Sequence, residues 1–381
     1  MSYMFVNTTF DRCDVVGDRC AYPNWVDVVC PTGYHHGHGG SRGAANMIDG
    51  INLSKVTDWV QGRIPEIAPP LDFELIAGGH SNLTFKFTDT QGSAYVLRRP
   101  PLGHVLESAH DMGREHRIVL ALSGSSVPVA PTYGLCEDTD VNGAPFYLMG
   151  FVSGVVLHNQ QPAQKMTEAE RHSFGLHAIE VLSDLHLINP DDVGLGQLGR
   201  KEAYIERQLK RWTKQWEATK THEIPEMDES LRLLHEDLPV QVGAAIVHGD
   251  YRPGNMIVAE GRMAALLDWE LCTLGDPLAD VGYMLNNWPS AGERGAENAP
   301  TALEGFPDRG EIQERYEVAT GRSLERINYY RAFSHWRLGA ITQGVYKRYL
   351  VGAMGKQEFD LEAYKEGIST RARSALKLLT D

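Results

Sequence analysis

Residues 247–270 read VHGDYRPGNMIVAEGRMAALLDWE, and this stretch is the most informative part of the sequence for both fold and function. The apolar run 244–247 leads into it, and two more short apolar runs, 256–258 and 264–267, follow. A turn with Pro and Gly separates the first run from the second, and the polar turn 260–262 separates the second from the third. Short apolar runs between turn residues are typical of buried strands, so the pattern predicts one strand followed by a hairpin.

An oxygen-bearing side chain stands where each predicted strand meets its loop. Asp250 follows the first strand, Asn255 precedes the second and Asp268 follows the third. A hairpin with this layout brings the three side chains to one end of a small sheet. Two carboxylates and an amide oxygen are hard ligands that suit Mg2+ better than a soft metal. The arrangement predicts a site that handles phosphate groups.

The spacing of His248, Asp250 and Asn255 is HxDxxxxN, the catalytic-loop pattern of the kinase superfamily. In that pattern the Asp accepts the proton of the substrate hydroxyl and the Asn holds a metal ion. Asp268 stands where the superfamily has its second metal-binding Asp, with Trp-Glu in place of Phe-Gly after it. An Asp after a buried strand is often only a turn residue, so the complete ordered set is much more specific than HxD alone.

Length and composition indicate a soluble enzyme of two lobes. The chain has 381 residues, more than a single hydrophobic core usually takes, with 42% hydrophobic and 23% charged residues. Its formal net charge of -14 argues against a nucleic-acid surface, which needs clustered Lys and Arg. No apolar run approaches the roughly 18 residues that span a bilayer. Charged residues in the first 30 positions argue against a secretory signal, and five scattered Cys fit reduced thiols. We expect a cytoplasmic protein that binds neither nucleic acid nor membrane.

Residues 1–46 differ in amino-acid composition from the rest of the chain. They contain Cys13, Cys20, Cys30, His35, His36 and His38. One interpretation is a metal-binding appendage, but the spacings lack the close Cys pairs of structural zinc sites. We expect a disordered extension instead. A helical pattern begins just after Met47, which makes Met47 a candidate for the natural start of translation.

The segment after the extension is predicted to bind nucleotide phosphates. Apolar residues recur at helical spacing over 51–60, and alternating strands then flank a glycine-rich tip. Glycines let backbone N–H groups approach phosphate oxygens, and polar side chains add donors. We therefore expect phosphate contacts from Gly78, Gly79, Ser81 and Asn82. The alternative is a Gly-Gly hairpin turn present for steric reasons only.

Two further features of this segment support ATP binding. Arg98 stands where a kinase has its phosphate-binding Lys, and its expected partner is Glu115. The stretch 146–154 is predicted to be the hinge, with Met149 and Phe151 against the adenine. The alternatives are a solvated pair of surface charges and a core strand that enters a loop.

Helical periodicity dominates the later part of the chain. It predicts helices over 112–122, 204–219 and 329–350 and a further helix that begins at Val281. The helix 329–350 mixes Arg, Lys, Trp and Tyr in an acidic protein. Such a mixture is usually a packing or solvated face. The sharper hypothesis is an anion-recognising wall for the substrate, formed by Arg337 and Arg348.

Five stretches together resemble the aminoglycoside phosphotransferase and choline kinase family: LRRPP, REHRIVLAL, VHGDYRPGNMIV, LLDWELCTLGDPLADVGY and FSHWRLGAITQGVYKRY. The chain is similar to the branch of kinase domains fused to acyl-CoA dehydrogenases, over about residues 48–375. The resemblance implies an α+β, protein-kinase-like fold of two lobes. The lobes are a small N-terminal antiparallel-sheet lobe, 47–152, that binds ATP, and a larger, mainly helical C-terminal lobe, 153–381, for catalysis and substrate. It also implies Mg2+ and a small hydroxylated acceptor, for this branch a hydroxy acid or its CoA thioester.

The predicted mechanism is in-line transfer of the ATP γ-phosphoryl group to the hydroxyl of a small molecule. Asp250 deprotonates the hydroxyl, while Asn255 and Asp268 hold Mg2+. Arg98, steadied by Glu115, neutralises phosphate charge, and the glycine-rich loop excludes water.

Two alternatives stay open at this point. One is a nucleotide-binding regulatory protein without transfer activity, which the Arg at position 98 makes conceivable. The other is an antibiotic kinase of the aminoglycoside type, which should offer a polycation an acidic pocket, whereas the late helix is basic. The sequence leaves open the acceptor, the choice between ATP and GTP, and whether the chain is a monomer or a homodimer.

Overall fold

A computed structural model describes residues 48–77, 82–102, 111–290, 292–293, 295–352 and 360–381. Of these, 48–123 and 129–153 form one unit, and 124–128 and 154–381 form a second. The predicted extension 1–46 lies outside the described residues. Gly78, Gly79 and Ser81 of the predicted phosphate loop also lie outside them.

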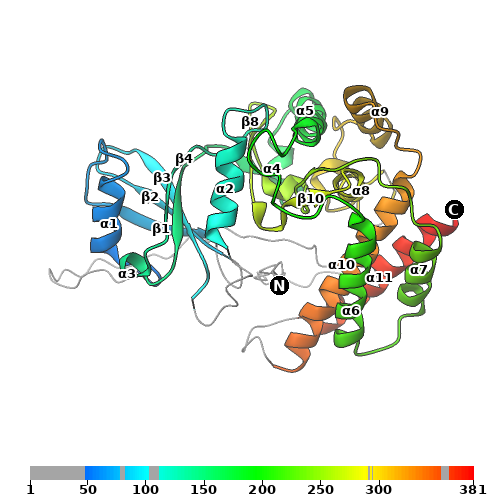
Figure 1. Cartoon of the computed structure of the whole chain (residues 1–381). Helices are drawn as coiled ribbons and strands as arrows, with labels where there is room; N and C mark the ends of the chain where they lie inside the picture. The colour runs from blue at the N-terminus through cyan, green and yellow to red at the C-terminus, as the bar shows by residue number, and fades with distance from the viewer. Residues whose placement is uncertain (1–47, 78–81, 103–110, 291, 294, 353–359) are drawn as a thin grey trace, which may run out of the picture. The chain divides into compact units, whose positions relative to one another are not determined.

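The first unit is built on a five-stranded antiparallel sheet with the strand order β1-β2-β3-β5-β4 (Figure 1). The strands are β1 (Asp72–Ala77), β2 (Leu83–Thr88), β3 (Ala94–Arg99), β4 (Thr132–Cys136) and β5 (Phe146–Gly150). β1 and β2 are the predicted strands around the glycine-rich tip, and they pair with Phe73 opposite Phe87. The sheet confirms the predicted small antiparallel lobe.

Three helices accompany this sheet: α1 (Leu53–Gln61), α2 (Met112–Leu122) and α3 (Thr139–Asn142). Successive residues of a strand point to opposite faces, so β3 contributes to two apolar clusters. Leu97 packs in one cluster with Val56 and Val60 of α1, and Val96 packs in the other with Met112 of α2. Burial on both faces fixes the register, because a shift by one residue would exchange the two sets.

Helices make up most of the second unit: α4 (Gln160–Gln164), α5 (Glu168–Leu187), α6 (Tyr204–Thr219), α7 (Pro225–Glu236), α8 (Leu278–Asn286), α9 (Arg309–Thr320), α10 (Ile327–Leu350) and α11 (Leu361–Thr380). α10 is buried along most of its length and packs against α6, α7, α8 and α11 (Figure 1). The Trp336 indole N–H donates to the Met227 carbonyl of α7 at 3.1 Å. α10 is therefore the helix around which the others of this unit gather.

Two small antiparallel sheets complete the second unit. One pairs β7 (Ala245–Val247) with β10 (Thr273–Gly275), and the other joins β6 (Val155–Val156), β8 (Met256–Ala259) and β9 (Arg262–Leu266). β7 is the predicted strand before Asp250, and β8 with β9 is the predicted hairpin. Both predictions are confirmed, whereas the pairing partner of β7 was not predicted.

Two helices have the predicted bounds, and two others, α8 and α10, begin earlier than predicted, α10 at Ile327 rather than at residue 329. The predicted helices 112–122 and 204–219 have the same bounds as α2 and α6. α8 begins at Leu278 rather than at Val281, because Asp276 accepts the Leu278 backbone N–H at 3.1 Å and caps an earlier turn. Among the described residues, no helix has the length and apolar character to cross a membrane.

Gly282 permits the close crossing of α8 and α10. A Cβ atom here would lie 2.7 Å from the Tyr330 carbonyl carbon and 2.9 Å from the Arg331 backbone nitrogen. Backbone atoms cannot rotate out of the way as a flexible side chain can. Gly282→Ala should therefore lower the free energy of unfolding by about 1–3 kcal/mol, measured by urea unfolding.

Gly310→Ala in α9 is the matched control, since a Cβ there meets only the Asp308 carboxylate, at 3.1 Å. A helical Gly→Ala change in open space should be neutral or stabilise by up to about 1 kcal/mol. Equal stability of the two variants would contradict the close crossing at Gly282.

Candidate functional site

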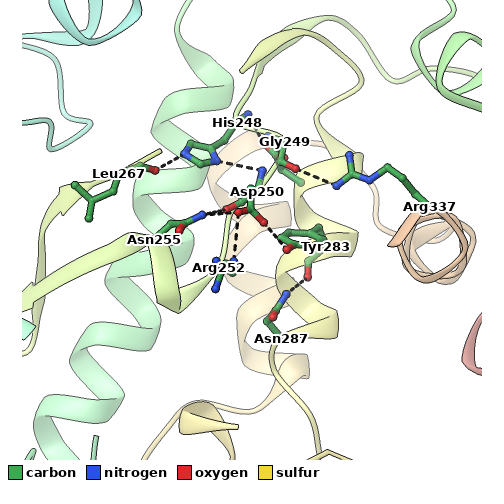
Figure 2. A network of polar contacts seen from close by, with 10 residues as sticks. His248, Gly249, Asp250, Arg252, Asn255, Leu267, Tyr283, Asn287 and Arg337 are labelled. Atoms are coloured by element: carbon green, nitrogen blue, oxygen red, sulfur yellow. Dashed lines mark hydrogen bonds and ion pairs between the residues drawn. The ribbon is translucent and has the colours of Figure 1, made fainter. Parts of the chain in front are cut away.

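Asp250 lies just beyond the end of β7, and only 2% of it is exposed. Figure 2 shows its carboxylate at the centre of a polar network. Oδ2 accepts hydrogen bonds from the Asn255 amide at 2.7 Å and from Arg252 Nε at 3.3 Å. Oδ1 accepts the hydroxyl of Tyr283, on α8. Both oxygens are held, so the carboxylate has one fixed orientation.

The turn that leads to Asp250 is clamped by a second carboxylate. Asp280 of α8 accepts the His248 backbone N–H at 2.6 Å and the Gly249 backbone N–H at 2.9 Å. Gly249 has a φ of +85°, and a Cβ there would lie 3.0 Å from the Leu271 carbonyl oxygen. A glycine is therefore required for the turn that presents both N–H groups to Asp280.

Asp280 is buried beside His186, whose Nε2 lies 3.5 Å from Oδ2. Burial raises the pKa of Asp280, but the His186 side chain and the Gly249 N–H together hold that pKa below its ordinary value. Burial lowers the pKa of His186. On its other side, His186 Nδ1 is hydrogen-bonded to the Tyr316 hydroxyl at 2.8 Å. The clamp is therefore a charged carboxylate held by α5, α8 and α9.

The His248 ring links this turn to the hairpin. Its Nδ1 accepts the Asp250 backbone N–H at 3.2 Å, so the ring proton lies on Nε2, which donates to the Leu267 carbonyl at 2.9 Å. The ring also packs on Trp269, with 4.8 Å between ring centroids. The His248 ring therefore braces the loop against the hairpin.

Asp268 is positioned through its neighbour Leu267. The Leu267 N–H donates to the Asn255 carbonyl at 2.8 Å, while its carbonyl accepts from His248. Asp268 itself is half-buried and has a φ of +65°, an uncommon left-handed conformation for a residue with a side chain. The three predicted residues are thus connected: Asn255 bonds Asp250 directly, and Asp268 follows the residue that bonds Asn255.

Charge in this group is balanced by Arg252. Burial disfavours the charged form of Arg252, but the carboxylates of Asp250 and Asp268 raise its pKa above the ordinary value. Both carboxylates are therefore close enough to act on one guanidinium. The local pattern of the sequence did not predict this role of Arg252.

The donor set fits Mg2+. Both acceptors that Asn255 meets on Asp250 are oxygens, so the NH2 group faces them and the amide oxygen Oδ1 faces away. That oxygen and the Asp268 carboxylate are hard donors, and Mg2+ usually takes only one or two protein ligands beside phosphates and water. The part of the chain that the structure describes has no group of three or more His, Cys, Asp or Glu suited to a metal.

Arg337 was predicted to face the substrate, but the structure places it against the loop that carries Asp250. It is 8% exposed, and its Nη2 donates to the Gly249 carbonyl at 2.9 Å (Figure 2). Its guanidinium also lies 5.6 Å from the centroid of the Tyr283 ring. In this structure Arg337 contacts the loop that carries Asp250. Arg348 is half-buried about three turns further along α10, and its substrate role stays a prediction.

In the first unit, Arg98 and Glu115 form the predicted ion pair. Arg98 Nε lies 2.8 Å from Glu115 Oε1, which also accepts the Tyr147 hydroxyl at 3.0 Å. Asn82 donates to the other oxygen at 3.4 Å. Glu115 is buried on α2, so the pairing of these side chains is confirmed, and phosphate binding by Arg98 and Asn82 stays a prediction.

The two predicted adenine contacts have different environments. Met149, on β5, is 9% exposed and packs in the cluster with Val96. Phe151 is 37% exposed, and Lys86 Nζ lies 4.7 Å from its ring centroid. Phe151 is thus an exposed apolar surface, whereas Met149 belongs to the core of the first unit.

Two functional candidates, Asp280 and Tyr283, were not predicted from the sequence. Both lie on α8, and the apolar pattern predicted that helix to begin only at Val281. Tyr283 is an aromatic residue on a helix, which is the usual pattern of a core residue. The only available signal was the spacing of Asp276 and Asp280, which places two carboxylates on one turn of the helix start.

The arrangement suits proton and phosphate chemistry. Asp250 offers a buried carboxylate of fixed orientation, which is what a general base needs. Asn255 and Asp268 add hard oxygen donors beside it. A carboxylate next to such donors can take a proton from a hydroxyl close to a metal-bound phosphate.

Comparisons with known proteins give the chain its family. The phosphotransferase enzyme family matches residues 72–315. The chain is 37% identical to mouse acyl-CoA dehydrogenase family member 10 over 295 residues, 74% of this chain but only 27% of that protein. It is 35% identical to chicken acyl-CoA dehydrogenase family member 11 over 296 residues, 75% of this chain and 38% of that protein. The chain thus spans about a third of the length of these relatives.

Solved structures agree with the sequence comparison. A putative aminoglycoside phosphotransferase from Ralstonia eutropha is 35% identical, with a TM-score of 0.75 over 86% of this chain and 98% of its own. A thermostable mutant of an aminoglycoside phosphotransferase, in complex with ADP and hygromycin B, is 17% identical, with a TM-score of 0.58 over 86% of this chain and 100% of its own. The latter shows the kinase-like fold alone. The chain belongs to the phosphotransferase enzyme family.

Proposed function

We propose that this protein is an ATP-dependent kinase that transfers the γ-phosphoryl group to a hydroxyl of a hydroxy acid or its CoA thioester. The observation that carries the proposal is the fixed, buried carboxylate of Asp250, bonded to the amide of Asn255. Membership of a phosphotransferase family supports transfer to a small molecule. The identity of the acceptor goes beyond the family.

Asp250 acts as the general base. Hydrogen bonds from Asn255 and Tyr283 hold its two oxygens, so no reorientation is needed when a hydroxyl binds. The acceptor hydroxyl gives its proton to this carboxylate as the oxygen attacks phosphorus. His248 and Arg337 hold the loop from two sides and take no part in the proton transfer.

Asn255 Oδ1 and Asp268 would hold Mg2+ in this proposal. When bound, the ion neutralises charge on the nucleotide phosphates. The two residues keep their spacing because Leu267 is hydrogen-bonded to both the Asn255 carbonyl and His248. Arg252 balances the charge of Asp250 and Asp268.

Residues of the first unit would bind the nucleotide. Arg98, held by Glu115, supplies positive charge for phosphate oxygens, with a planar fork where a kinase has a Lys. Asn82 lies next to this pair and follows the predicted phosphate loop. Phe151 offers an apolar face to the adenine.

The relatives favour a hydroxy acid or its thioester as acceptor. Their names refer to acyl-CoA dehydrogenases, enzymes whose substrates are CoA thioesters. The solved neighbours act on antibiotics by name, and one contains hygromycin B. An aminoglycoside is a polycation, and arginines on α10 would repel it. We therefore rank an antibiotic kinase second. A regulatory protein without transfer activity ranks third, because such a protein does not need the hydrogen bonds that join Asp250, Asn255 and the segment of Asp268.

The test is a mass-spectrometric screen for the gain of one phosphoryl group. Hydroxy acids, hydroxyacyl-CoAs, aminoglycosides and choline are incubated with the protein, ATP and Mg2+. We expect a gain on one acid or thioester class, and Asp250→Ala should reduce the rate by about a hundredfold or more, because general-base catalysis contributes that much. Binding of Mg-ATP by the variant should be largely retained.

Asp58→Ala is the matched control, because Asp58 is an exposed residue of α1. It should transfer phosphate at the rate of the unchanged protein. Full activity in Asp250→Ala would overturn the proposed base. Tight binding of Mg-ATP with no gain on any acceptor would favour the regulatory protein.

Tyr283 is a positioning residue for the base. Its hydroxyl donates to Asp250 Oδ1, and Tyr283→Phe removes only that bond. A hydrogen bond to a charged group contributes about 1.5–3 kcal/mol, so kcat should fall by about tenfold to a hundredfold while KM for ATP changes little. Steady-state kinetics separate the two parameters.

Tyr329→Phe is the control for lost stability alone. The Tyr329 hydroxyl is also buried and donates to the Leu234 carbonyl at 2.7 Å, remote from Asp250 in the network of contacts. Both variants should lose similar stability on heating, and only Tyr283→Phe should lose kcat. If both lose kcat alike, Tyr283 has no special role in positioning Asp250.

A further inference from the structure

Four cationic or imidazole side chains gather where α9, α10 and α11 meet α8. Arg331 and His335 are one turn apart on α10, and Arg309 is the first residue of α9. Arg371 of α11 lies against the same face of α10, since a Cβ at Gly339 would be 4.0 Å from the Arg371 Cβ. Arg331, Arg309 and Arg371 all act electrostatically on His335, so the four groups form one cluster.

Among the described residues, Arg309 and Arg331 share one nearby carboxylate, that of Glu293. Glu293 pairs with both Nη atoms of Arg309, at 2.5 and 2.7 Å, and Arg309 Nε also donates to the Leu285 carbonyl at the end of α8. Arg331 instead donates to two neutral amide oxygens, of Asn286 at 3.2 Å and of Asn328 at 3.4 Å. Within the described ranges, no carboxylate lies at ion-pair distance from Arg331. Arg331 is half-buried, and the carboxylate that acts on it, Glu293, is the one already paired with Arg309. One carboxylate thus serves two guanidinium groups, which suggests an anion from outside the chain.

The titration of the cluster agrees with this imbalance. Burial, with Arg309 next to it, lowers the pKa of Arg331 to about 10. Burial, together with Arg371, Arg331 and Arg309, lowers the pKa of His335 to about 3, so the imidazole is neutral. His335 Nδ1 is buried and has no hydrogen-bond partner among the described residues. Neighbouring cations thus disfavour further positive charge at this place.

The cluster is connected to Asp250 through residues of α8. Asn286, which accepts from Arg331 Nε, is one helical turn after Tyr283 on α8, and Tyr283 donates to Asp250. Residues three apart on a helix have Cβ atoms about 5–6 Å from one another. Arg371 also acts electrostatically on Tyr283. A small molecule with its hydroxyl at Asp250 can therefore place a group a few bonds away near Arg331.

We propose that Arg331, assisted by His335 and Arg371, binds the carboxylate of an acceptor whose hydroxyl lies at Asp250. This inference rests on the proposed kinase function and narrows its acceptor to a free, short-chain hydroxy acid. The planar guanidinium of Arg331 suits the two oxygens of a carboxylate. His335 is the neutral partner beside it.

The test measures binding separately from transfer. Isothermal titration calorimetry without ATP gives the Kd of 2-, 3- and 4-hydroxybutyrate and of the amide of each acid. At least one acid should bind more tightly than its amide. Arg331→Gln should raise the Kd of that acid by about tenfold to a hundredfold, to the level of the amide, because a hydrogen bond to a charged group is lost.

Two further variants control for charge and folding. Arg326→Gln removes a guanidinium from the start of α10, where Arg326 is exposed and paired with Asp237, and should leave Kd unchanged. Arg331→Lys keeps the charge without the planar fork and should give a Kd between those of the unchanged protein and Arg331→Gln. If Arg331→Gln fails to fold, the Kd of the acid for Arg331→Lys tests the proposal by itself: a raised Kd supports it, and an unchanged Kd overturns it.

The outcomes distinguish this inference from the proposed function. Equal affinity for acids and amides, or acid affinity that is unchanged by both Arg331 substitutions, would overturn the carboxylate site even if phosphoryl transfer occurs. Acid binding that depends on Arg331 without any transfer from Mg-ATP would keep the site and contradict the kinase. Binding and transfer of the same acid, both weakened by Arg331→Gln, would support both.

Discussion

The carboxylate of Asp280 accepts two consecutive peptide N–H groups, those of His248 and Gly249, and the position of Asp250 depends on this clamp. An unsatisfied buried N–H costs about 1–3 kcal/mol, so these two hydrogen bonds stabilise the turn in its present position. Arg337 donates to the carbonyl of the same turn from α10. Two helices, α8 and α10, therefore hold the N–H side and the C=O side of one short segment. The Asp250 carboxylate is thus positioned by the helical part of the unit rather than by its own loop.

From this turn, hydrogen bonds extend the same frame to the hairpin. His248 donates to the Leu267 carbonyl, and the Leu267 N–H donates to the Asn255 carbonyl. Asp250, Asn255 and Asp268 thus belong to one hydrogen-bonded frame. Such a frame is the preorganisation that phosphoryl transfer requires, since positioning and charge stabilisation supply most of its catalysis. The cationic cluster around Arg331 is joined to this frame through Asn286 and α8.

The sequence predicted the parts that local pattern controls. Short apolar runs with turn residues predicted β7 and the β8–β9 hairpin, and the order of His248, Asp250 and Asn255 indicated the chemistry. Contacts between distant segments were not predictable in this way. Asp280 and Arg337 contact the loop that carries Asp250 from positions 31 and 88 residues away from Gly249, and no local pattern marks such a partner. An Arg on a helix has the same pattern whether it faces solvent, substrate or a buried carbonyl, so Arg337 was assigned to the substrate although the structure buries it against Gly249.

Phosphorus NMR of ATP, Mg2+ and a hydroxy acid incubated with the protein separates phosphoryl transfer from hydrolysis in one spectrum. If the protein is a hydroxy-acid kinase, the γ-phosphate signal of ATP decays while the signal of a phosphate monoester on the acid grows in equal amount. Release of inorganic phosphate alone, or an unchanged ATP spectrum with every hydroxylated compound tried, would contradict this function.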